Sequence, residues 1–435
     1  MGGGIMQLMF SGKQNKHITG NPQTTHFKAV YFRHTNFAIE SIPCTFNQTI
    51  STNNDSEVVS IVQRSGDLVA GAHIEFTLKR TQPGTLPTDG SYINWTNSTG
   101  HALIKEISFE INSQVIDKHY AEWLDIWNEL TDPHYKEHIL INKHLAKHVY
   151  LKSNGFTTNY VKCYVPLKFW FCRNPGLAYP LIALQNTTSY IKVKFRNPYT
   201  LINTDCTTNS IGTITYEKSP ELYLDYVYLD TKERRDFANK SHQYLIDTLQ
   251  FNHISNFNTI IDLNFINPVK ELIWIIRNKN VKTEKDLSTI SNDADAYSNT
   301  ASSLTKNNDY FNYLSESASS QNEYIYTYTA YEPFNEVELL LNGNSRFNKR
   351  KATYFRTVQP NTYHSKIPSK HIYLYSFALK PEEHQPSGIC NFSKLKTAQL
   401  KFTNPNTNNT EILVYALSYN LLRIKNGQAG LAYVQ

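Results

Sequence analysis

Two blocks of this sequence occur twice, more than 200 residues apart and in the same order. The first pair is Ile107–Gln114 (ISFEINSQ) and Val337–Asn344 (VELLLNGN), and each block predicts a strand that runs into a hairpin turn. The second pair is Val193–Pro198 (VKFRNP) and Leu400–Pro405 (LKFTNP). Here two apolar residues lie two apart on one strand face, and a proline ends the strand.

One more apolar strand follows each second block, at Leu222–Leu229 and Ile412–Tyr419. Because the order of the elements matches, we interpret the chain as two similar β-rich halves that arose by duplication. The repeat has the size of a domain, which excludes a short-period solenoid. A chain of 435 residues also fits two all-β domains of roughly 150 to 250 residues, each large enough for its own core.

The composition favours strands over surface helices. Aromatic residues make up 13% of the chain, with 29 Tyr and 22 Phe, and only 18% of residues are charged. The net charge of +6 is small for this length. We interpret its densest basic run, Lys349–Lys351, as a solvated loop, and we expect no DNA binding, because the N-terminal arm (residues 1–26) offers only Lys13 and Lys16 to neutralise phosphates.

The apolar pattern predicts short strands joined by long connections. The expected strands, which include the repeated blocks, lie at 27–33, 58–64, 73–79, 102–111, 160–171, 190–195, 260–265, 271–277, 324–328, 337–341, 371–379, 398–402 and 412–419. Between Lys118 and Lys152 the spacing becomes helical, and the charged segment Asp230–Asp236 is expected to form a short exposed helix or turn. Residues 278–323 lose nearly all periodicity, which predicts a functional or disordered loop.

These elements predict an all-β chain with two tandem eight-stranded sandwiches of the jelly-roll kind, a short helical insertion and long loops. The expected domains are an N-terminal arm at 1–26, a first jelly roll at 27–229, a linker at 230–238 and a second jelly roll at 239–435. Long loops are tolerated because the strand ends gather at the two ends of a sandwich, away from the core.

Several segments resemble the major capsid proteins of large icosahedral double-stranded DNA viruses of the chlorella-virus and iridovirus type. They are, in order, Ile18–Lys28, Tyr31–Glu40, Ile116–Tyr120, Asn174–Gln185, Arg346–Arg350, Tyr373–Pro381, Gln385–Ser393 and Asn420–Tyr433. The resemblance covers both ends and the middle of the chain. It departs from the family in residues 278–323 and 197–217, which are expected to be outward-facing decoration peculiar to this chain.

The resemblance implies a double jelly roll and a homotrimer with a pseudo-hexagonal outline. It further implies an icosahedral shell over an internal lipid membrane, minor capsid proteins as partners, late expression and assembly in the host cytoplasm. It implies a structural protein with no enzymatic activity, no cofactor, and no catalytic, cofactor-binding or metal-binding residues. Glycans on outer loops are compatible with it.

One motif points to catalysis instead. His134-Tyr-Lys-Glu-His138 has the H-x-x-E-H spacing of inverted zinc metalloproteases, in which two histidines bind metal and Glu137 activates water. That chemistry needs one long helix, which Pro133 limits, and a third ligand that the sequence does not suggest. His144 and His148 add a second i, i+4 pair, for which a polar helix face is the simpler interpretation.

A carbohydrate-binding or carbohydrate-cleaving sandwich is the remaining alternative. Asp225 with Asp230, or Glu382 with Glu383, would be its carboxylate pair, although surface positions are the simpler interpretation of all four. No nucleotide-binding or nucleophile-elbow motif occurs.

The cysteines and sequons indicate the compartment. An odd number of dispersed cysteines argues against a disulfide framework and against a zinc knuckle, namely Cys44, Cys163, Cys172, Cys206 and Cys390. No apolar run suffices to span a bilayer, and no secretory signal is expected. N-glycosylation acceptors are present, but a cytoplasmic chain would not meet the secretory enzymes, so we interpret most as coincidence: Asn47, Asn54, Asn94, Asn97, Asn186, Asn239, Asn391 and Asn408.

Overall fold

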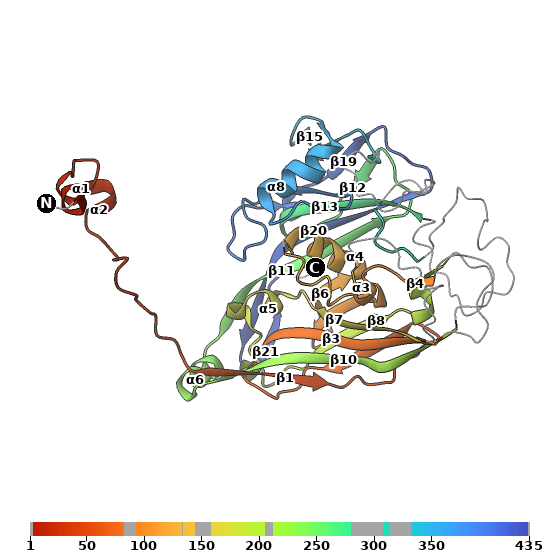
Figure 1. Ribbon diagram of the computed structural model, residues 1–435. Coiled ribbons are helices and arrows are strands. Elements are labelled where there is room, and N and C mark those ends of the chain that lie inside the picture. Colours follow the sequence, from red (N-terminus) through yellow and green to blue (C-terminus); the bar gives the residue numbers. More distant parts are fainter. Residues whose placement is uncertain are drawn as a thin grey trace. The chain divides into compact units, whose positions relative to one another are not determined.

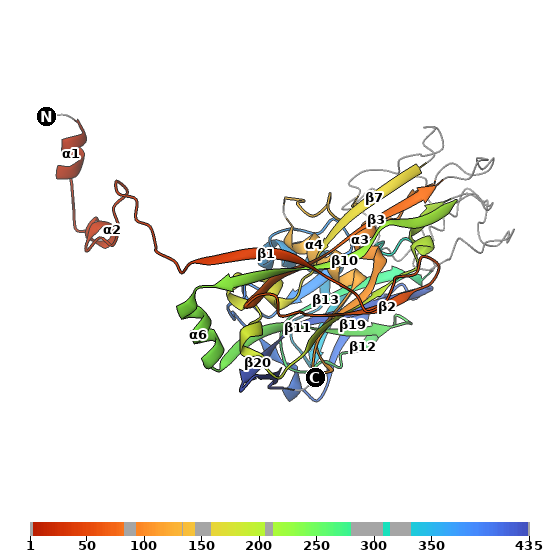
Figure 2. The same ribbon diagram turned by 90° about the horizontal axis from the view of Figure 1, so that it is seen from below.

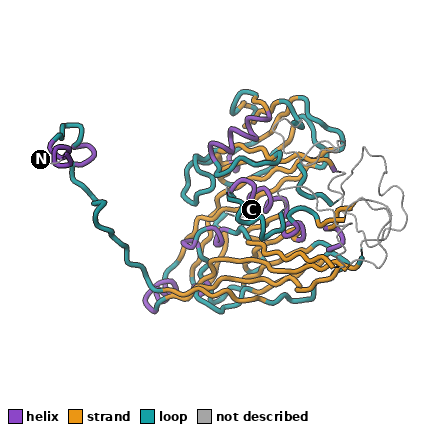
Figure 3. Tube along the Cα trace, in the orientation of Figure 1, coloured by secondary structure: helices purple, strands orange, loops and turns teal. Residues whose placement is uncertain are grey.

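A computed structural model describes residues 3–81, 93–132, 134–143, 158–204, 212–279, 308–313 and 332–433 of the chain. The chain divides into two compact units, Met1–Phe37 and Ala38–Gln435. Strands dominate the second unit (Figure 3).

The first unit holds two short helices, α1 (Gly3–Met9) and α2 (Lys16–Thr19). None of the residues that the structure describes in this unit is buried. The strand expected at Phe27–Arg33 is wrong, because these residues are irregular and fully exposed. A strand needs a neighbour to pair with its backbone groups, and the first residue in a strand is Phe37.

The first half of the larger unit contains two four-stranded sheets, which Figure 2 shows in part. One has the order β1-β10-β3-β7, with bounds Phe37–Cys44, Thr213–Leu229, Leu68–Thr81 and Thr158–Pro166. The other has the order β2-β8-β5-β6, with bounds Ser56–Ile61, Ser189–Phe195, Ile104–Ile111 and Gln114–Tyr120. A separate two-stranded sheet joins β4 (Ile93–Trp95) to β9 (Ile202–Thr204).

The second half repeats this arrangement (Figure 1). One sheet has the order β11-β20-β13-β17, with bounds His242–Ile254, Thr410–Lys425, Pro268–Asn278 and Ile372–Ser376; β18 (Cys390–Asn391) and β21 (Gln428–Leu431) pair beside it. The other has the order β12-β19-β14-β15, with bounds Ile260–Asp262, Ala398–Thr403, Glu336–Leu341 and Asn344–Ser345; β16 (Arg350–Lys351) pairs with β14.

The repeated sequence blocks occupy equivalent places in the two halves. In the first half β5 pairs with β8, so that Ile107 lies opposite Val193; in the second half β14 pairs with β19, so that Val337 lies opposite Phe402. The trailing apolar segments belong to β10 and β20, which are the second strands of corresponding sheets. The two halves therefore share one strand order as well as similar sequence.

Both hairpins turn through two residues with positive φ. They are Asn112 and Ser113 (46° and 70°) in the first half, and Asn342 and Gly343 (52° and 80°) in the second. Two consecutive left-handed residues are the signature of the turn whose twist matches paired strands. Glycine adopts this conformation without steric cost, whereas serine does not.

Exchanging the residue types at these two turns should therefore change stability in opposite directions. We expect Gly343→Ser to lower the free energy of unfolding by about 1 kcal/mol. Ser113→Gly should raise it by less than that, because glycine relieves the backbone strain of the turn but also gives the unfolded chain more conformational freedom. Thermal unfolding of both variants checks this. Two shifts of the same sign would contradict it.

Helices occur mainly in the connections. Their bounds are α3 Thr99–Leu103, α4 Ala121–Thr131, α5 Trp170–Arg173, α6 Thr231–Asn239 and α8 Gln359–Tyr363; a π-helical turn at Tyr354–Val358 precedes α8, and short 3₁₀ turns lie at Pro175–Leu177, Leu181–Ala183, Pro198–Leu201 and Phe392–Lys394. The helix α4 confirms the first part of the predicted insertion, and α6, which has no buried residue, confirms the exposed linker helix. The strand predicted from Ala102 begins only at Ile104, after α3. No helix among the described residues is long and apolar enough to cross a bilayer.

The predicted loop 278–323 is described only in part. Within it, Tyr310, Phe311 and Tyr313 are buried, and Tyr310 Oη donates a hydrogen bond of 3.0 Å to the carbonyl oxygen of Thr200 in the first half. This short stretch is therefore packed against the fold and is not external decoration, because it carries aromatic side chains that bury apolar area. The strand predicted at 324–328 lies outside the described residues.

Candidate functional site: the junction between the sandwiches

The sheet β11-β20-β13-β17 is apolar on both faces. Leu272, Trp274 and Ile276 point into the core of the second sandwich, whereas Ile273 and Ile275 belong to the core cluster of the first. Alternate residues of a strand point to opposite faces, so one sheet can serve two cores. It thereby joins the sandwiches through buried apolar area, the largest favourable contribution to folding.

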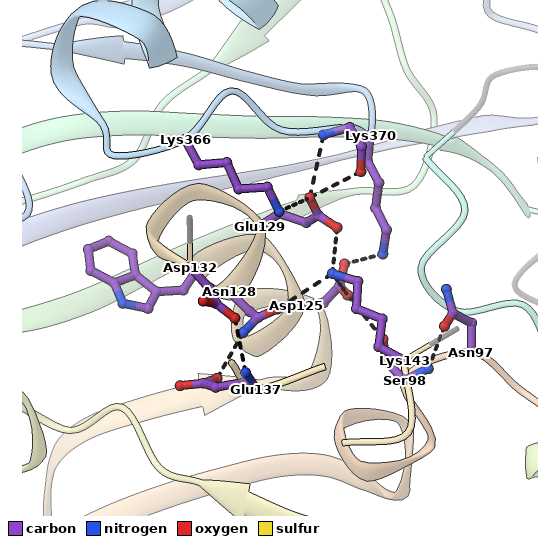
Figure 4. Close-up of polar contacts among 12 residues, drawn as sticks. Asn97, Ser98, Asp125, Asn128, Glu129, Asp132, Glu137, Lys143, Lys366 and Lys370 are labelled. Carbon is purple, nitrogen blue, oxygen red and sulfur yellow. Dashed lines mark hydrogen bonds and ion pairs between the residues drawn. The ribbon is translucent and has the colours of Figure 1, made fainter. Parts of the chain in front are cut away.

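Helix α4 lies at this junction (Figure 1). Every residue from Ala121 to Leu130 is buried. The Trp123 ring packs on Tyr415 of β20 at a centroid distance of 5.5 Å. Acidic residues of the same helix face charged partners of the second half, and Figure 4 shows how they converge.

A cluster of five charged side chains links α4 to residues 366–370 (Figure 4). The Lys370 Nζ lies 2.6 Å from Asp125 Oδ2, and Lys366 Nζ lies 3.4 Å from Glu129 Oε2. Lys143 forms an ion pair with Glu129. Burial alone would raise the pKa of Glu129, but Lys143, Lys370 and Lys366 outweigh it and hold that pKa far below its usual range. The Glu129 carboxylate is therefore charged in the folded chain.

A second ion cluster spans the junction through Arg277 of β13. Its guanidinium lies 2.7 Å from Glu411 of β20 and 3.0 Å from Glu122 of α4, and it donates to the carbonyl oxygen of Tyr310 at 3.0 Å. The Arg277 side chain is 1% exposed. Planar guanidinium groups suit such multiple contacts because their donors point in fixed directions.

A third contact uses Asp247 of β11. Its carboxylate lies 2.9 Å from Lys270 of β13 and 3.3 Å from Arg173 of α5, whose guanidinium lies 4.4 Å from the Trp127 ring centroid. A buried charge is unfavourable unless an opposite charge lies beside it. Each ion pair therefore tolerates only the relative position of the two sandwiches that keeps its charged groups in contact. We infer that these ion pairs fix the orientation of the two sandwiches, while the apolar area supplies the stability.

The imidazole of His364 lies beside the same junction. It is 2.8 Å from Glu271 and 3.0 Å from Glu382, and its ring packs edge-on against Trp127. Burial alone would lower the His364 pKa, but Glu271 and Glu382 outweigh it and raise that pKa to about 9. The histidine is therefore a cation at neutral pH.

Stability should consequently fall as the solution becomes alkaline. His364 gains a proton more readily in the folded chain, so its contribution is complete below pH 6.5 and is lost as the pH rises through about 9. We expect a loss of about 2–3 kcal/mol over this interval in the wild type. The variant His364→Gln should be less stable and show a smaller decline in thermal midpoint; an unchanged decline would contradict the assignment.

The H-x-x-E-H segment is not arranged as a metal site. It forms a turn after α4, not the long helix that the motif requires. His134 is exposed while His138 is buried, and the Glu137 carboxylate accepts a hydrogen bond from Asn128 at 2.8 Å and pairs with Lys168. Among the described residues no group of three His, Cys, Asp or Glu could hold a metal ion. His144 and His148 lie outside them.

In each of the two carboxylate pairs considered for a glycosidase, the two members contact different residues. Asp230 caps the start of α6, whereas Asp225 lies on β10 beside Gly71. Glu382 binds His364 and Ser365, while Glu383 pairs with Lys380. Neither pair converges on a common site, so the geometry gives no support to a glycosidase.

The remaining candidates are surface features or core residues. Cys44, Cys163, Cys172 and Cys390 are free thiols, and Cys206 lies outside the described residues. The sequon residue Asn97 is half-buried and the Asn94 side chain is not described; the exposed sequon residues are Asn47, Asn54, Asn186, Asn239, Asn391 and Asn408.

Sequence reasoning missed the buried ion clusters. The signal that could have revealed them is the apolar run of β13, which Lys270, Glu271 and Arg277 flank.

Models of known protein families match both halves of the chain. Residues 25–230 match the model described as major capsid protein N-terminus, and residues 233–430 match that of the large eukaryotic DNA virus major capsid protein. Over the full length of both chains, the sequence is 38% identical to the major capsid protein of Pyramimonas orientalis virus and 34% identical to that of Paramecium bursaria Chlorella virus 1.

Solved structures give the same result. A chain of the PBCV-1 virus capsid matches with a TM-score of 0.72 and 30% identity, covering 94% of this chain and all of that one. The Faustovirus major capsid protein matches with a TM-score of 0.70 at 14% identity, covering 95% and 94%, and supports the fold alone. The predicted double jelly roll is confirmed, and the protein is a structural component of a viral capsid and not an enzyme. The chain belongs to the major capsid proteins of large eukaryotic DNA viruses.

Proposed function

We propose that three copies of this chain form a capsomer with a pseudo-hexagonal outline, and that these capsomers tile an icosahedral shell over an internal membrane. The observation that carries the proposal is the shared strand order of the two halves. Three chains then present six similar sandwiches while keeping only threefold symmetry. One polypeptide can thus occupy a near-hexagonal lattice.

The junction supports this proposal on physical grounds. A six-sided unit needs the two sandwiches of each chain at a constant angle, because neighbouring units must meet the same edges. Buried ion pairs such as Arg277–Glu122 and Lys370–Asp125 restrict that angle, since any rotation would separate charges inside the protein.

The oligomeric state tests the proposal directly. Size-exclusion chromatography with light scattering should give three times the chain mass of 50.1 kDa, and electron micrographs of the same fraction should show hexagonal outlines. A monomer or dimer over the whole accessible concentration range would overturn the trimer.

Several finer features belong to the same proposal. Minor capsid proteins would bind the shell's inner side, glycans would attach to outer loops, and late-made chains would assemble in the host cytoplasm. The arm at 1–26, the jelly rolls at 27–229 and 239–435 and the linker at 230–238 are its domain division. Mass spectrometry of virions, with attention to exposed sequons such as Asn47 and Asn408, tests the glycans and partners together.

A further inference from the structure

The first unit of the chain, Met1–Phe37, has an unusual charge. It contains four basic residues, Lys13, Lys16, Lys28 and Arg33, and no aspartate or glutamate. The first acidic residue is Glu40. Four of the six net positive charges of the whole chain therefore lie in this short unit.

The same unit exposes large apolar side chains. Helix α1 and the residue after it present Ile5, Met6, Leu8, Met9 and Phe10 to solvent, with Leu8 at 81% and Phe10 at 77% exposure. At helical spacing these residues form one broad apolar face, and Gln7 with two glycines forms the remainder.

Exposed aromatic residues also follow the two helices in the sequence. Phe27 is 98% exposed, Phe32 is 94% exposed, and Tyr31 between them is also exposed. Scattered single apolar residues are ordinary on a protein surface, but a contiguous apolar segment without a covering partner marks an interaction site.

The combination of properties selects the partner. An apolar helix with basic and aromatic residues beside it fits the boundary between lipid headgroups and acyl chains, where the apolar face enters and the cations meet anionic headgroups. Nucleic acid would use the charges but not the aliphatic face, because phosphate contacts require dense basic residues. A neutral protein groove would use the apolar face but not the excess of positive charge.

We propose that Met1–Phe37 is an interfacial anchor that binds an anionic lipid bilayer, with Ile5–Phe10 inserted at the headgroup boundary and Lys13 and Lys16 on the headgroups. This inference rests on the proposed function, because it names the segment that contacts the proposed internal membrane. Lipid binding itself is measurable without a shell.

Sedimentation of the full-length protein with sucrose-loaded vesicles tests the anchor. We expect binding to phosphatidylcholine mixed with phosphatidylglycerol and much weaker binding to phosphatidylcholine alone. The variant Lys13→Gln/Lys16→Gln should bind the mixed vesicles roughly thirtyfold more weakly. The variant Leu8→Ser/Met9→Ser/Phe10→Ser should lose at least about a hundredfold in affinity, and added salt should weaken the wild type.

Matched substitutions outside the unit serve as controls. Lys349→Gln/Lys351→Gln removes two exposed basic residues, and Leu379→Ser/Ile389→Ser removes two exposed apolar ones; both variants should bind vesicles like the wild type. Equal binding to neutral and anionic vesicles, no vesicle binding by the wild type, or equal losses in the control variants would each overturn the anchor. Light scattering on the same samples separates the two proposals, because a trimer that ignores vesicles overturns the anchor alone.

Discussion

Replacing Arg277 with methionine is expected to lower the free energy of unfolding by about 3–5 kcal/mol, the range measured when one partner of a buried ion pair is removed. The guanidinium is buried between Glu411 and Glu122, 2.7 and 3.0 Å away. Methionine preserves much of the apolar volume, so the main loss is the counter-charge of two buried carboxylates. Because those carboxylates come from β20 and α4, the damage falls on the contact between the two halves.

Denaturant unfolding followed by tryptophan fluorescence measures this, since Trp123 and Trp127 lie at the junction. Lys380→Met is the matched control, because its pair with Glu383 is largely exposed and such pairs contribute less than about 1 kcal/mol. The double variant Arg277→Met/Glu122→Gln should recover part of the loss, as it removes one stranded charge. Equal, small effects at Arg277 and Lys380 would contradict a role for the buried ion cluster.

The sequence predicts the repeated architecture because its signals are local. Asn342–Gly343 identifies a hairpin turn, and the alternation in Ile107–Ile111 identifies the strand before the equivalent turn. The same reasoning fails at Phe27–Arg33, where an apolar and aromatic run has a strand-like composition but no partner strand among the residues described. Strand propensity reports a fit to a half-buried pleated surface, which this segment lacks.

The junction was much harder to predict, because its partners are remote in sequence. Lys370 and Asp125 are 245 residues apart and meet only after both halves have folded. Two signals were nevertheless present. Unbroken apolar runs at Leu272–Ile276 and Ile412–Leu417 indicate strands buried on both faces, and the predicted helix α4 carries acidic residues on a face that must also be buried.

Acidification should destabilise the protein through its buried neutral histidines. Burial, helped by Lys143 and Lys366 and opposed by Glu129 and Asp132, lowers the pKa of His138 to about 4.

Burial likewise lowers the pKa of His371 to about 4, with Arg356 acting in the same direction and Glu332 against it. Burial also holds the pKa of His101 well below its ordinary value, aided by Lys168, Lys143 and Lys370. Among the described residues, neither ring nitrogen of His101 or His138 has a hydrogen-bond partner, so no hydrogen-bond acceptor stabilises a proton on either ring.

Stability should fall with falling pH because these histidines take up a proton near pH 6.5 in the unfolded chain, well above their pKa in the folded chain. Their contribution is complete above that value and is lost as the pH falls toward 4. His138 and His371 should each remove about 2 kcal/mol by pH 5. Since His101 and His138 lie among the lysines of the junction, protonation adds positive charge where Lys143, Lys366 and Lys370 already exceed Asp125 and Glu129 by one charge.

Unfolding midpoints measured from pH 7 to pH 4 in the wild type, His138→Phe and His371→Phe test this. Each variant should decline less steeply than the wild type, and the double variant least. His134→Phe is the matched control, because its side chain is exposed four residues from His138 and its profile should follow the wild type. Carboxylates contribute to acid unfolding in all five proteins, so the differences between their pH profiles isolate the contribution of the histidines. Parallel profiles would exclude the histidines as the cause and leave the junction insensitive to mild acid.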